Sequence, residues 1–427
     1  MSPEALGRRV MGTILARMRA GSVEIVEDGV SRRYGQGEPS AKVIVRSPRV
    51  WADVLRGSRG LAESYANGLW DSPDPADVVR VCALNIEPFD RLRRRLAPLR
   101  APLRRALGVG RRNTRERSRA AIAAHYDRGN EMFELMLDPT MTYSCGFFES
   151  PDATLQEASL AKLGRVCRKL RLGPDDHVLE IGTGWGSFAI HAAGEYGCRV
   201  TTTTLSREQL DYATRAVREA GLEDRVTLLF EDYRDLRGRY DKLVSIEMIE
   251  AVGWRGFPTF FERCSELLEP DGTMLLQAIA IDDRAYGVEK DSASFIRQII
   301  FPDGCLPSVE VIAHCVAGHT DLRFLDLEDI SAHYVPTLRA WRDNLERSGA
   351  ELTRRGYDEN FQRLWRFYLA YCEAGFAERR IRDVQVLLAK PEFRDEARSL
   401  HGVNLEQVRP ARFARRQPGR DADPVAS

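Results

Sequence analysis

The sequence predicts an α/β protein built around a parallel, doubly wound sheet. Between residues 159 and 280, β-rich and helical stretches alternate with short turns, and this βαβαβ order produces parallel strands. A glycine-rich loop follows the first of these strands. From residue 283 onward the pattern turns mostly helical. We therefore expect a central sheet, a helical cap or insertion over about 283–380, and a final strand after it.

Residues 1–90 predict a small α+β domain. The opening "MSPEALGRRVMGTILARMRAG" is typical of an amphipathic helix. Its apolar patch is short and no small-residue cleavage site follows, so we do not expect a signal peptide. Strands are predicted at "VEIVEDG" and "AKVIVRS", and helices at "VWADVLRG" and "ADVVRVCAL". The stretch "LAESYANGLWDSPDP" is expected to be the loop-rich end of this domain.

A basic linker is predicted at 91–117. Nine arginines lie between residues 91 and 112, with leucines at roughly helical spacing and two prolines that interrupt them. Two interpretations stay open: a solvated, kinked linker helix, or a basic amphipathic surface that touches anionic phospholipid headgroups. No stretch reaches 18 apolar residues, so the sequence predicts no membrane span.

The elements of the main domain, residues 118–400, follow from local pattern. Strands are expected at "HVLEIG", "RVTTTTL", "RVTLLFED", "KLVSIEMI" and "TMLLQAIAI". Helices are expected at "SFAIHAAGEYG", at "SREQLDYATRAVREAG" with a serine cap, and at "FPTFFERCSELLEPDG", ended by Pro270 and Gly272. The cap contains "RAWRDNLERSGAEL" and "NFQRLWRFYLAYCEAGFAERR", and "DVQVLLAK" is the final strand. The polar tail, 401–427, is predicted to be disordered.

Charge and cysteine content exclude some classes of function. The chain has 63 basic and 63 acidic residues, which argues against a general nucleic-acid binder. Its eight cysteines form no C-x-x-C pair and only seven histidines are present, so neither a metal site nor a disulfide scaffold is indicated. We expect a reduced, cytoplasmic protein.

The loop Gly182-x-Gly184-x-Gly186 lets backbone N–H groups approach a ligand closely. Its spacing is not G-x-G-x-x-G and no P-loop lysine follows, so a phosphate cradle is not indicated. Taken alone, the loop is also compatible with a tight turn from strand to helix. Glu180 precedes it on the strand, placed to meet a cationic amine. Asp232, in the acid pair "ED", follows the third strand, near the place expected for an adenine edge.

Together these features resemble a class I S-adenosylmethionine-dependent methyltransferase. One feature departs from the common pattern, because the second strand ends in "TTTTLS" with no acidic residue for the ribose hydroxyls. Thr204 and Gln209 are expected to serve instead.

Five longer motifs occur in the order found in the cyclopropane fatty acid synthase family, which the chain resembles over about 118–390. They are "HYDRGNEMFELMLDPTMTYSCGFF", "EMIEAVG", "FIRQIIFPDGCLPS", "HYVPTLRAW" and "YLAYCEAGF". The N-terminal domain is similar to the extra domain of the longer, phospholipid-acting members. The resemblance implies a Rossmann-like methyltransferase sheet with a helical lipid-binding cap. It also implies these cofactor contacts: Tyr143, Ser144, Glu180, Gly182, Gly184, Gly186, Thr204, Leu205, Gln209, Asp232 and Tyr233.

The resemblance further implies the reaction. S-adenosylmethionine methylates a cis double bond of a phospholipid acyl chain, and a bound bicarbonate ion removes a proton from the resulting cation. Cys145 is then expected to line the bicarbonate site largely through its backbone, without acting as a nucleophile. Glu250 and Tyr334 are expected to hydrogen-bond bicarbonate, with Cys372 nearby. Two alternatives stay open: Cys372 as a small buried hydrophobe, and Glu250 as an ordinary carboxylate at a helix start.

Gln277 departs from this pattern, because the family has a histidine that contacts bicarbonate there. Glutamine can donate a hydrogen bond but cannot become cationic or relay a proton. Bicarbonate would then be held differently or be absent, and a different loss of the proton would give an exo-methylene chain, the precursor of a methyl-branched fatty acid. This product is favoured over the alternative, a cyclopropane ring.

Two other classes of function compete with the lipid methyltransferase. They are a small-molecule N- or O-methyltransferase and a non-enzymatic lipid-binding protein. The basic linker and the apolar motifs favour lipid, and the intact glycine loop favours an enzyme. Expected partners are the membrane at its inner face, to which the protein is peripheral, a partner reductase and a second copy in a homodimer. The apolar helices of 283–380 are expected to form the acyl tunnel.

Overall fold

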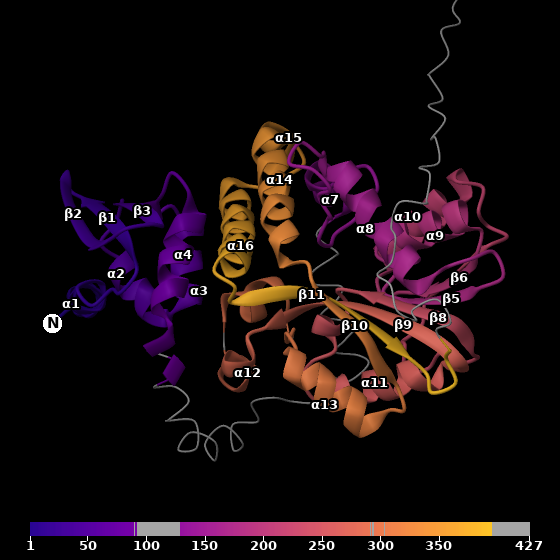
Figure 1. The fold of residues 1–427 in the computed structure, drawn as a ribbon. Helices are drawn as coiled ribbons and strands as arrows, with labels where there is room; N and C mark the ends of the chain where they lie inside the picture. The colour runs from indigo at the N-terminus through magenta and orange to yellow at the C-terminus, as the bar shows by residue number, and fades with distance from the viewer. Residues whose placement is uncertain (89, 92–128, 291, 293, 303, 395–427) are drawn as a thin grey trace, which may run out of the picture. The chain divides into compact units, whose positions relative to one another are not determined.

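The computed structural model describes residues 1–88, 90–91, 129–290, 292, 294–302 and 304–394 (Figure 1). The described residues up to Phe393 form one compact unit. Apart from Arg91, the predicted basic linker at 91–117 lies outside the described residues. The predicted disordered tail at 401–427 lies outside them as well.

The central sheet has seven strands in the order β10-β11-β9-β8-β5-β6-β7 (Figure 1). Strands β5 to β9 pair in parallel, β11 runs antiparallel to β9, and β10 runs antiparallel to β11. The predicted parallel, doubly wound α/β sheet is therefore confirmed, with an antiparallel strand added at one side. The strands are β5 (His177–Ile181), β6 (Arg199–Thr203), β7 (Val226–Leu229), β8 (Tyr240–Ile246), β9 (Leu268–Ile281), β10 (Arg323–Asp329) and β11 (Ile381–Ala389).

Helices cover both faces of this sheet. Successive strand side chains point to opposite faces, so Val178 packs with one helical layer and Leu179 with the other. The first layer contains α8 (Leu155–Leu170), α9 (Ser187–Tyr196) and α10 (Arg207–Glu219). The second contains α11 (Phe257–Glu266) and α13 (Val309–His319).

Three expectations about single elements were wrong. Helix α11 ends at Glu266, before Pro270, because Leu268 already pairs with Tyr240 at the start of β9. The segment expected to be helical after 283 contains β10, whose largely exposed, mixed sequence becomes a strand by pairing with β11. The expected loop "LAESYA" belongs to α3 (Ser58–Ala66), which buries one side of the helix in the core.

Further helices form the cap. They are α7 (Asn130–Met136), α12 (Asp283–Glu289), the π-helical turn η3 (Ile296–Ile300), α14 (Tyr334–Arg347), α15 (Gly349–Arg354) and α16 (Glu359–Ala377). Except for α12, these helices contribute buried side chains to one apolar cluster rich in aromatic rings. Among the described residues, no helix is both long enough and apolar enough to cross a bilayer.

The N-terminal part contains a four-stranded sheet in the order β2-β1-β3-β4, with β1 parallel to β3. The expected amphipathic helix is present as α1 (Pro3–Leu15). The other elements are β1 (Gly21–Glu27), β2 (Val30–Gln36), β3 (Ser40–Val45), α2 (Val50–Asp53), β4 (Trp70–Asp71) and α4 (Pro75–Asn85).

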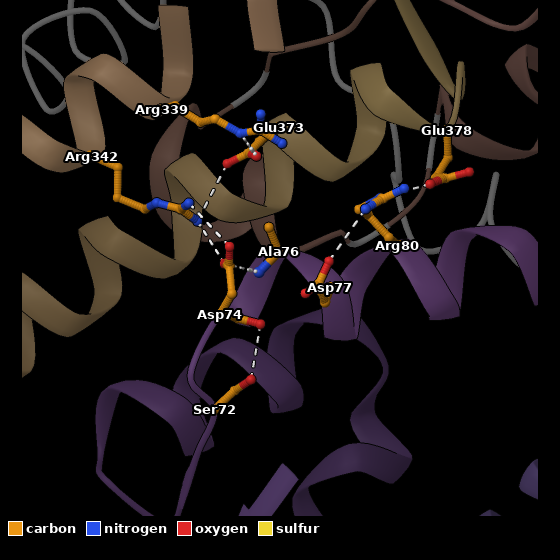
Figure 2. A network of polar contacts seen from close by, with 9 residues as sticks. All are labelled: Ser72, Asp74, Ala76, Asp77, Arg80, Arg339, Arg342, Glu373 and Glu378. Atoms are coloured by element: carbon orange, nitrogen blue, oxygen red, sulfur yellow. Dashed lines mark hydrogen bonds and ion pairs between the residues drawn. The ribbon is translucent and has the colours of Figure 1, made fainter. Parts of the chain in front are cut away.

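Ion pairs join this N-terminal part to the cap helices (Figure 2). Asp74 caps α4 by accepting from the backbone N–H of Ala76, and it also accepts from Arg342 Nη1 across 2.8 Å. The same guanidinium lies 3.3 Å from Glu373, a carboxylate on α16 that is only 2% exposed. Arg80 on α4 pairs with Glu378 across 2.8 Å. Ion pairs that include the buried Glu373 and Arg342 therefore hold α4 against α14 and α16.

Candidate active site

The glycine loop after β5 has the open backbone that a bound ligand requires. Gly182, Gly184 and Gly186 have φ angles of +107°, +53° and +96°, which side chains with a Cβ rarely adopt. A Cβ on Gly182 would lie 3.1 Å from Met248, whereas a Cβ on Gly184 would meet nothing within 4 Å. The loop is therefore tight on the side of Met248 and open at Gly184, which fits a cofactor that passes close to the backbone.

Glu180 supplies the expected acid at this loop. Its side chain is 3% exposed, and Oε2 accepts a hydrogen bond from Thr202 Oγ1 across 2.6 Å. Burial raises its pKa to about 8. A cationic amine beside Glu180 would restore its charge, because an opposite charge favours ionisation. The contact of Glu180 with the amino end of S-adenosylmethionine stays a prediction.

The expected ribose and adenine contacts follow the next two strands. Thr204 Oγ1 donates to Gln209 Oε1 across 2.9 Å, which joins the end of β6 to the start of α10. Asp232 is bound by Arg234 through two bonds, Nε to Oδ1 at 2.7 Å and Nη2 to Oδ2 at 2.6 Å. Tyr233 packs its ring against Phe260. The clamp on Asp232 was not expected from the sequence, and its contact with adenine stays a prediction.

The stretch "TYSCGFF" provides two more expected contacts. The Tyr143 hydroxyl lies 2.9 Å from the Tyr368 hydroxyl on α16. Ser144 Oγ accepts from Lys162 Nζ across 2.7 Å. Lys162, on α8, is 1% exposed, and burial lowers its pKa. Leu205 follows Thr204 in the turn before α10.

A second polar centre surrounds Glu247, the residue that follows β8. Its Oε1 accepts from the backbone N–H of Cys145 at 2.9 Å and from Gln277 Nε2 at 2.8 Å. Its Oε2 accepts from the Tyr334 hydroxyl at 2.6 Å. The structure thus brings together three of the expected bicarbonate contacts, Cys145, Gln277 and Tyr334, around a carboxylate of the chain itself.

Gln277 is fully engaged within this centre. Its Nε2 also donates to Asp383 Oδ2 across 2.9 Å, and its Oε1 accepts from Gln385 Nε2 across 3.1 Å. Gln277 and Asp383 are both 0% exposed. Because an amide nitrogen has two protons, Gln277 has none left for an added anion.

The two carboxyl groups of this centre differ in charge. Burial and the neighbouring Glu247 raise the pKa of Asp383 well above its usual value. Burial also raises the pKa of Glu247, but its three donors and the nearby Lys162 favour the ionised form. When two carboxyls lie this close, one proton is shared, and here it belongs on Asp383.

Glu250 stands apart from these donors. Its Oε1 accepts from the backbone N–H of Ile279 across 2.6 Å. Its Oε2 is buried and has no hydrogen-bond partner among the residues that the structure describes. Burial, with the charge of Glu247, raises its pKa to about 8. Glu250 Oε2 is therefore still open to a hydrogen-bond donor.

These contacts test the fit of bicarbonate. A bicarbonate ion at the expected position would need the Cys145 N–H, the Tyr334 hydroxyl and the Gln277 amide, and Glu247 already accepts from all three. The residues present therefore do not fit a separate bicarbonate ion there.

Cys145 and Cys372 lack the features of a reactive cysteine, because burial raises the pKa of both thiols. Cys145 is fully buried, and burial raises the pKa of its thiol well above the usual value, so it stays protonated. Cys372 packs at the edge of the apolar cluster, and burial raises its pKa to about 12. No hydrogen bond in the described part of the chain joins Cys372 to Glu247 or its partners. Nor do His, Cys, Asp and Glu side chains there form a group of three that could hold a metal ion.

Aromatic rings surround the polar centre. Tyr334 stacks on Phe376 with ring centroids 4.2 Å apart, and Trp341 meets Tyr334 edge to face. Tyr143 packs against Trp341 and Phe133. These π faces exclude water and favour positive charge nearby.

Three residues of this centre were not predicted from the sequence. Glu247 lies inside the quoted motif "EMIEAVG", at the carboxyl end of a parallel strand, where ligands commonly bind. Lys162 is one of six lysines and falls on the apolar side of α8. Asp383 begins the buried part of an apolar strand. A charged residue at a core-facing position was the available signal for the last two.

Comparison with known proteins gives the family. The family model described as mycolic acid cyclopropane synthetase matches residues 113–386. This chain belongs to that family.

Two relatives match a longer part of this chain than the family model does. The tuberculostearic acid methyltransferase UfaA1 of Mycobacterium tuberculosis is 38% identical over 363 residues, which cover 82% of this chain and 84% of the relative. The cyclopropane-fatty-acyl-phospholipid synthase of Escherichia coli is 36% identical over 357 residues, 83% of this chain and 89% of the relative.

Solved structures of the family share the fold. The mycolic acid cyclopropane synthase CmaA1 of the family, complexed with SAH and CTAB, has a TM-score of 0.59 and 30% identity, and the match covers 64% of this chain and 98% of that chain. The cyclopropane synthase MmaA2 from Mycobacterium tuberculosis has a TM-score of 0.60 with the same coverage. This chain therefore has the class I methyltransferase fold of these two cyclopropane synthases.

Proposed function

We propose that this chain transfers a methyl carbon from S-adenosylmethionine to a cis double bond in a phospholipid acyl chain and forms an exo-methylene product. Family membership supports an S-adenosylmethionine-dependent C-methyltransferase of fatty acyl lipids. The product, the phospholipid and the position of the double bond are the parts proposed here.

S-adenosylmethionine, when bound, supplies an electrophilic methyl carbon. An alkene is a weak nucleophile, so the chain must hold it in line with that carbon in a dry site. Gly182, Gly184 and Glu180 would position the donor. Tyr334, Phe376 and Trp341 would exclude water and stabilise the positive charge that develops on the acyl chain.

The two products differ in what happens after transfer. The π electron pair forms the bond to the methyl carbon, the sulfur keeps the electron pair of the broken bond, and the neighbouring chain carbon becomes cationic. For a ring, a methyl C–H loses its proton and the electron pair closes onto that cation. For a methylene, a hydride first moves from the methyl-bearing carbon to the cation, and a methyl C–H then loses its proton to form C=CH2. Each route releases one proton.

The hydrogen bonds of Gln277 are the observation that favours the methylene product over the cyclopropane. Its amide is bound on both sides by carboxyl groups, so the site lacks a histidine and a free donor for bicarbonate. A mobile, well-placed base would take the methyl proton at once and favour ring closure. A fixed and hydrogen-bonded base would act more slowly and allow the hydride shift first. Similarity to a methyltransferase named for tuberculostearic acid, a methyl-branched chain, supports the same product.

Product analysis tests this function. Purified protein, isotope-labelled S-adenosylmethionine and vesicles of cis-unsaturated phospholipid are incubated without any reductase, and the lipids are then treated with ozone. We expect a labelled chain that ozone cleaves to a mid-chain ketone. A labelled chain that resists ozone would indicate a cyclopropane and overturn the proposed product. Absence of label in lipid would overturn the proposed reaction.

Three further expectations belong to this proposal. The chain would bind the membrane peripherally to reach acyl chains, a reductase would convert the methylene to a methyl branch, and two copies would form a homodimer. The small-molecule methyltransferase alternative gains no support from the aromatic, largely buried site.

A further inference from the structure

We propose that Glu247 is the catalytic base of this reaction and takes the place of bicarbonate. This inference rests on the proposed function, because it concerns the proton that methyl transfer releases. It assigns to a residue of the chain a role that the family resemblance gives to a bound ion.

The hydrogen bonds of Glu247 are the first observation that supports this role. A carboxylate has about four acceptor positions on its two oxygens. Cys145 N–H, Gln277 Nε2 and the Tyr334 hydroxyl use three of them. The side chain of Asp383 also hydrogen-bonds this carboxylate. The Glu247 carboxylate thus has the charge, planar shape and donors that the expected ion would have.

The backbone of Glu247 supplies a second, independent observation. Its φ angle is +49°, in the left-handed region, which costs a non-glycine residue about 1–2 kcal/mol. Its N–H donates to the Gln277 carbonyl across 2.8 Å, which fixes this turn at the end of β8. Strained backbone of this kind is common at functional sites. Glycine would adopt the turn without strain, so the presence of glutamate indicates a use for its side chain.

The location of Glu247 fits the reaction. The next residue, Met248, lies against Gly182 of the cofactor loop. On its other side, Glu247 accepts from Cys145, one residue after Ser144, a predicted cofactor contact. Unlike Gln277 and Asp383, Glu247 keeps part of its surface accessible. Glu247 is therefore more accessible to a substrate than either of these two neighbours.

The neighbours of Glu247 keep it ready to accept a proton. Burial and the charge of Glu247 favour the protonated form of Asp383, and Lys162 favours the ionised form of Glu247. In the proposed step, a C–H bond of the transferred methyl breaks, its electron pair forms the new carbon–carbon double bond, and the Glu247 carboxylate takes the proton. The carboxyl then returns the proton to water after the product leaves.

The experiment measures bicarbonate dependence. Methyl transfer from labelled S-adenosylmethionine to cis-unsaturated phospholipid vesicles is followed in degassed, bicarbonate-free buffer, with and without added bicarbonate. We expect the wild-type rate to change less than about 2-fold. A wild-type rate that collapses without bicarbonate and returns with it would overturn the inference, although the proposed function would stand. No methyl transfer under either condition would instead overturn the proposed function.

Two variants complete the test. Glu247→Gly removes the carboxylate and relieves the positive φ, so the fold should be retained, and the vacated donors should accept an added ion. We expect a loss of at least ~100-fold without bicarbonate, as for removal of a general base, and recovery of at least ~10-fold on adding bicarbonate or formate. Glu247→Gln keeps the shape, should lose as much activity, and should not be rescued because its amide fills the site.

Arg171→Gly is the matched control. Arg171 is an exposed residue at the C-terminus of α8 with φ +54°, so this variant makes the same backbone change away from the centre. It should keep wild-type activity in both buffers. Each Glu247 variant should bind S-adenosylmethionine with unchanged Kd. Glu247 variants that methylate at the wild-type rate in bicarbonate-free buffer would overturn the inference.

Discussion

The hydroxyl of Tyr334, at the start of α14, donates to Oε2 of Glu247, at the end of β8, across 2.6 Å. This bond connects the cap to the sheet at the polar centre. Tyr334→Phe removes the donor and keeps the ring that stacks on Phe376. A hydrogen bond to a charged group contributes about 1.5–3 kcal/mol, so we expect kcat for lipid methylation to fall about 10- to 100-fold.

Steady-state kinetics and calorimetry check this prediction, with the Kd for S-adenosylmethionine expected to stay unchanged. The control is Tyr196→Phe, which removes a hydroxyl on α9 that donates to the Gly164 carbonyl on α8, has no contact with Glu247, and should leave kcat unchanged. Equal kcat in the two variants would contradict a role for the Tyr334 hydroxyl.

Gln277 is predicted to stabilise the centre as well as to separate its two carboxyls. Gln277→Leu has a similar volume but leaves Glu247 Oε1 and Asp383 Oδ2 each without one buried donor. The unsatisfied groups should lower the free energy of unfolding by about 1–3 kcal/mol. Urea denaturation followed by circular dichroism measures this change. A variant as stable as wild type would show that the amide bonds contribute little.

The buried Glu180 makes the cofactor-free protein sensitive to pH. Its pKa in the folded state is about 8, raised above its usual 4.5, so between these values the folded state holds a proton that the unfolded state has lost. The contribution of Glu180 to stability therefore falls as pH rises through this range. Glu180→Gln cannot ionise, so this variant lacks the fall in stability that Glu180 causes as pH rises.

We expect the Tm of Glu180→Gln, relative to wild type, to increase as pH rises from 4.5 to about 8. The same variant should bind S-adenosylmethionine more weakly, since it lacks the charge that would meet the amine. Thermal scans without cofactor and titration calorimetry measure the two effects. A Tm difference independent of pH would be evidence that Glu180 titrates normally.

Arg342 should contribute strongly to stability through the network in Figure 2. Arg342→Met keeps much of the apolar stem but leaves Glu373 with only the largely exposed Arg339 among the ion pairs described for it. Breaking a buried pair costs about 3–5 kcal/mol. Denaturation curves should show a loss of this order for Arg342→Met and little change for Arg347→Met, an exposed position on the same helix. Similar losses in both would contradict a specific role for the network.

Local pattern was sufficient to predict the strands and helices around the cofactor loop. The serine cap of α10 and the glycines after β5 are signals that depend on a few adjacent residues. Strand β10 was missed because its sequence becomes a strand only by pairing with β11, which lies more than fifty residues later.

The polar centre shows the same limit. Motif position selected Glu250 as the principal carboxylate, three residues from Glu247, which has the donors. The choice depends on contacts from Cys145, Gln277 and Tyr334, which lie on separate elements far apart in sequence. The roles of Asp383 and Lys162 also follow only from burial beside Glu247. Sequence periodicity could predict that these side chains face the core, but it could not predict which residues they contact.

The most direct measurement of the central claim follows a hydrogen on the acyl chain. Phospholipid with deuterium on both carbons of its cis double bond is methylated by the purified protein, and the product is examined by mass spectrometry and NMR. The account predicts a C=CH2 group with both chain deuteriums on one adjacent carbon, because one has migrated as deuteride. A cyclopropane with one deuterium on each original carbon would contradict it.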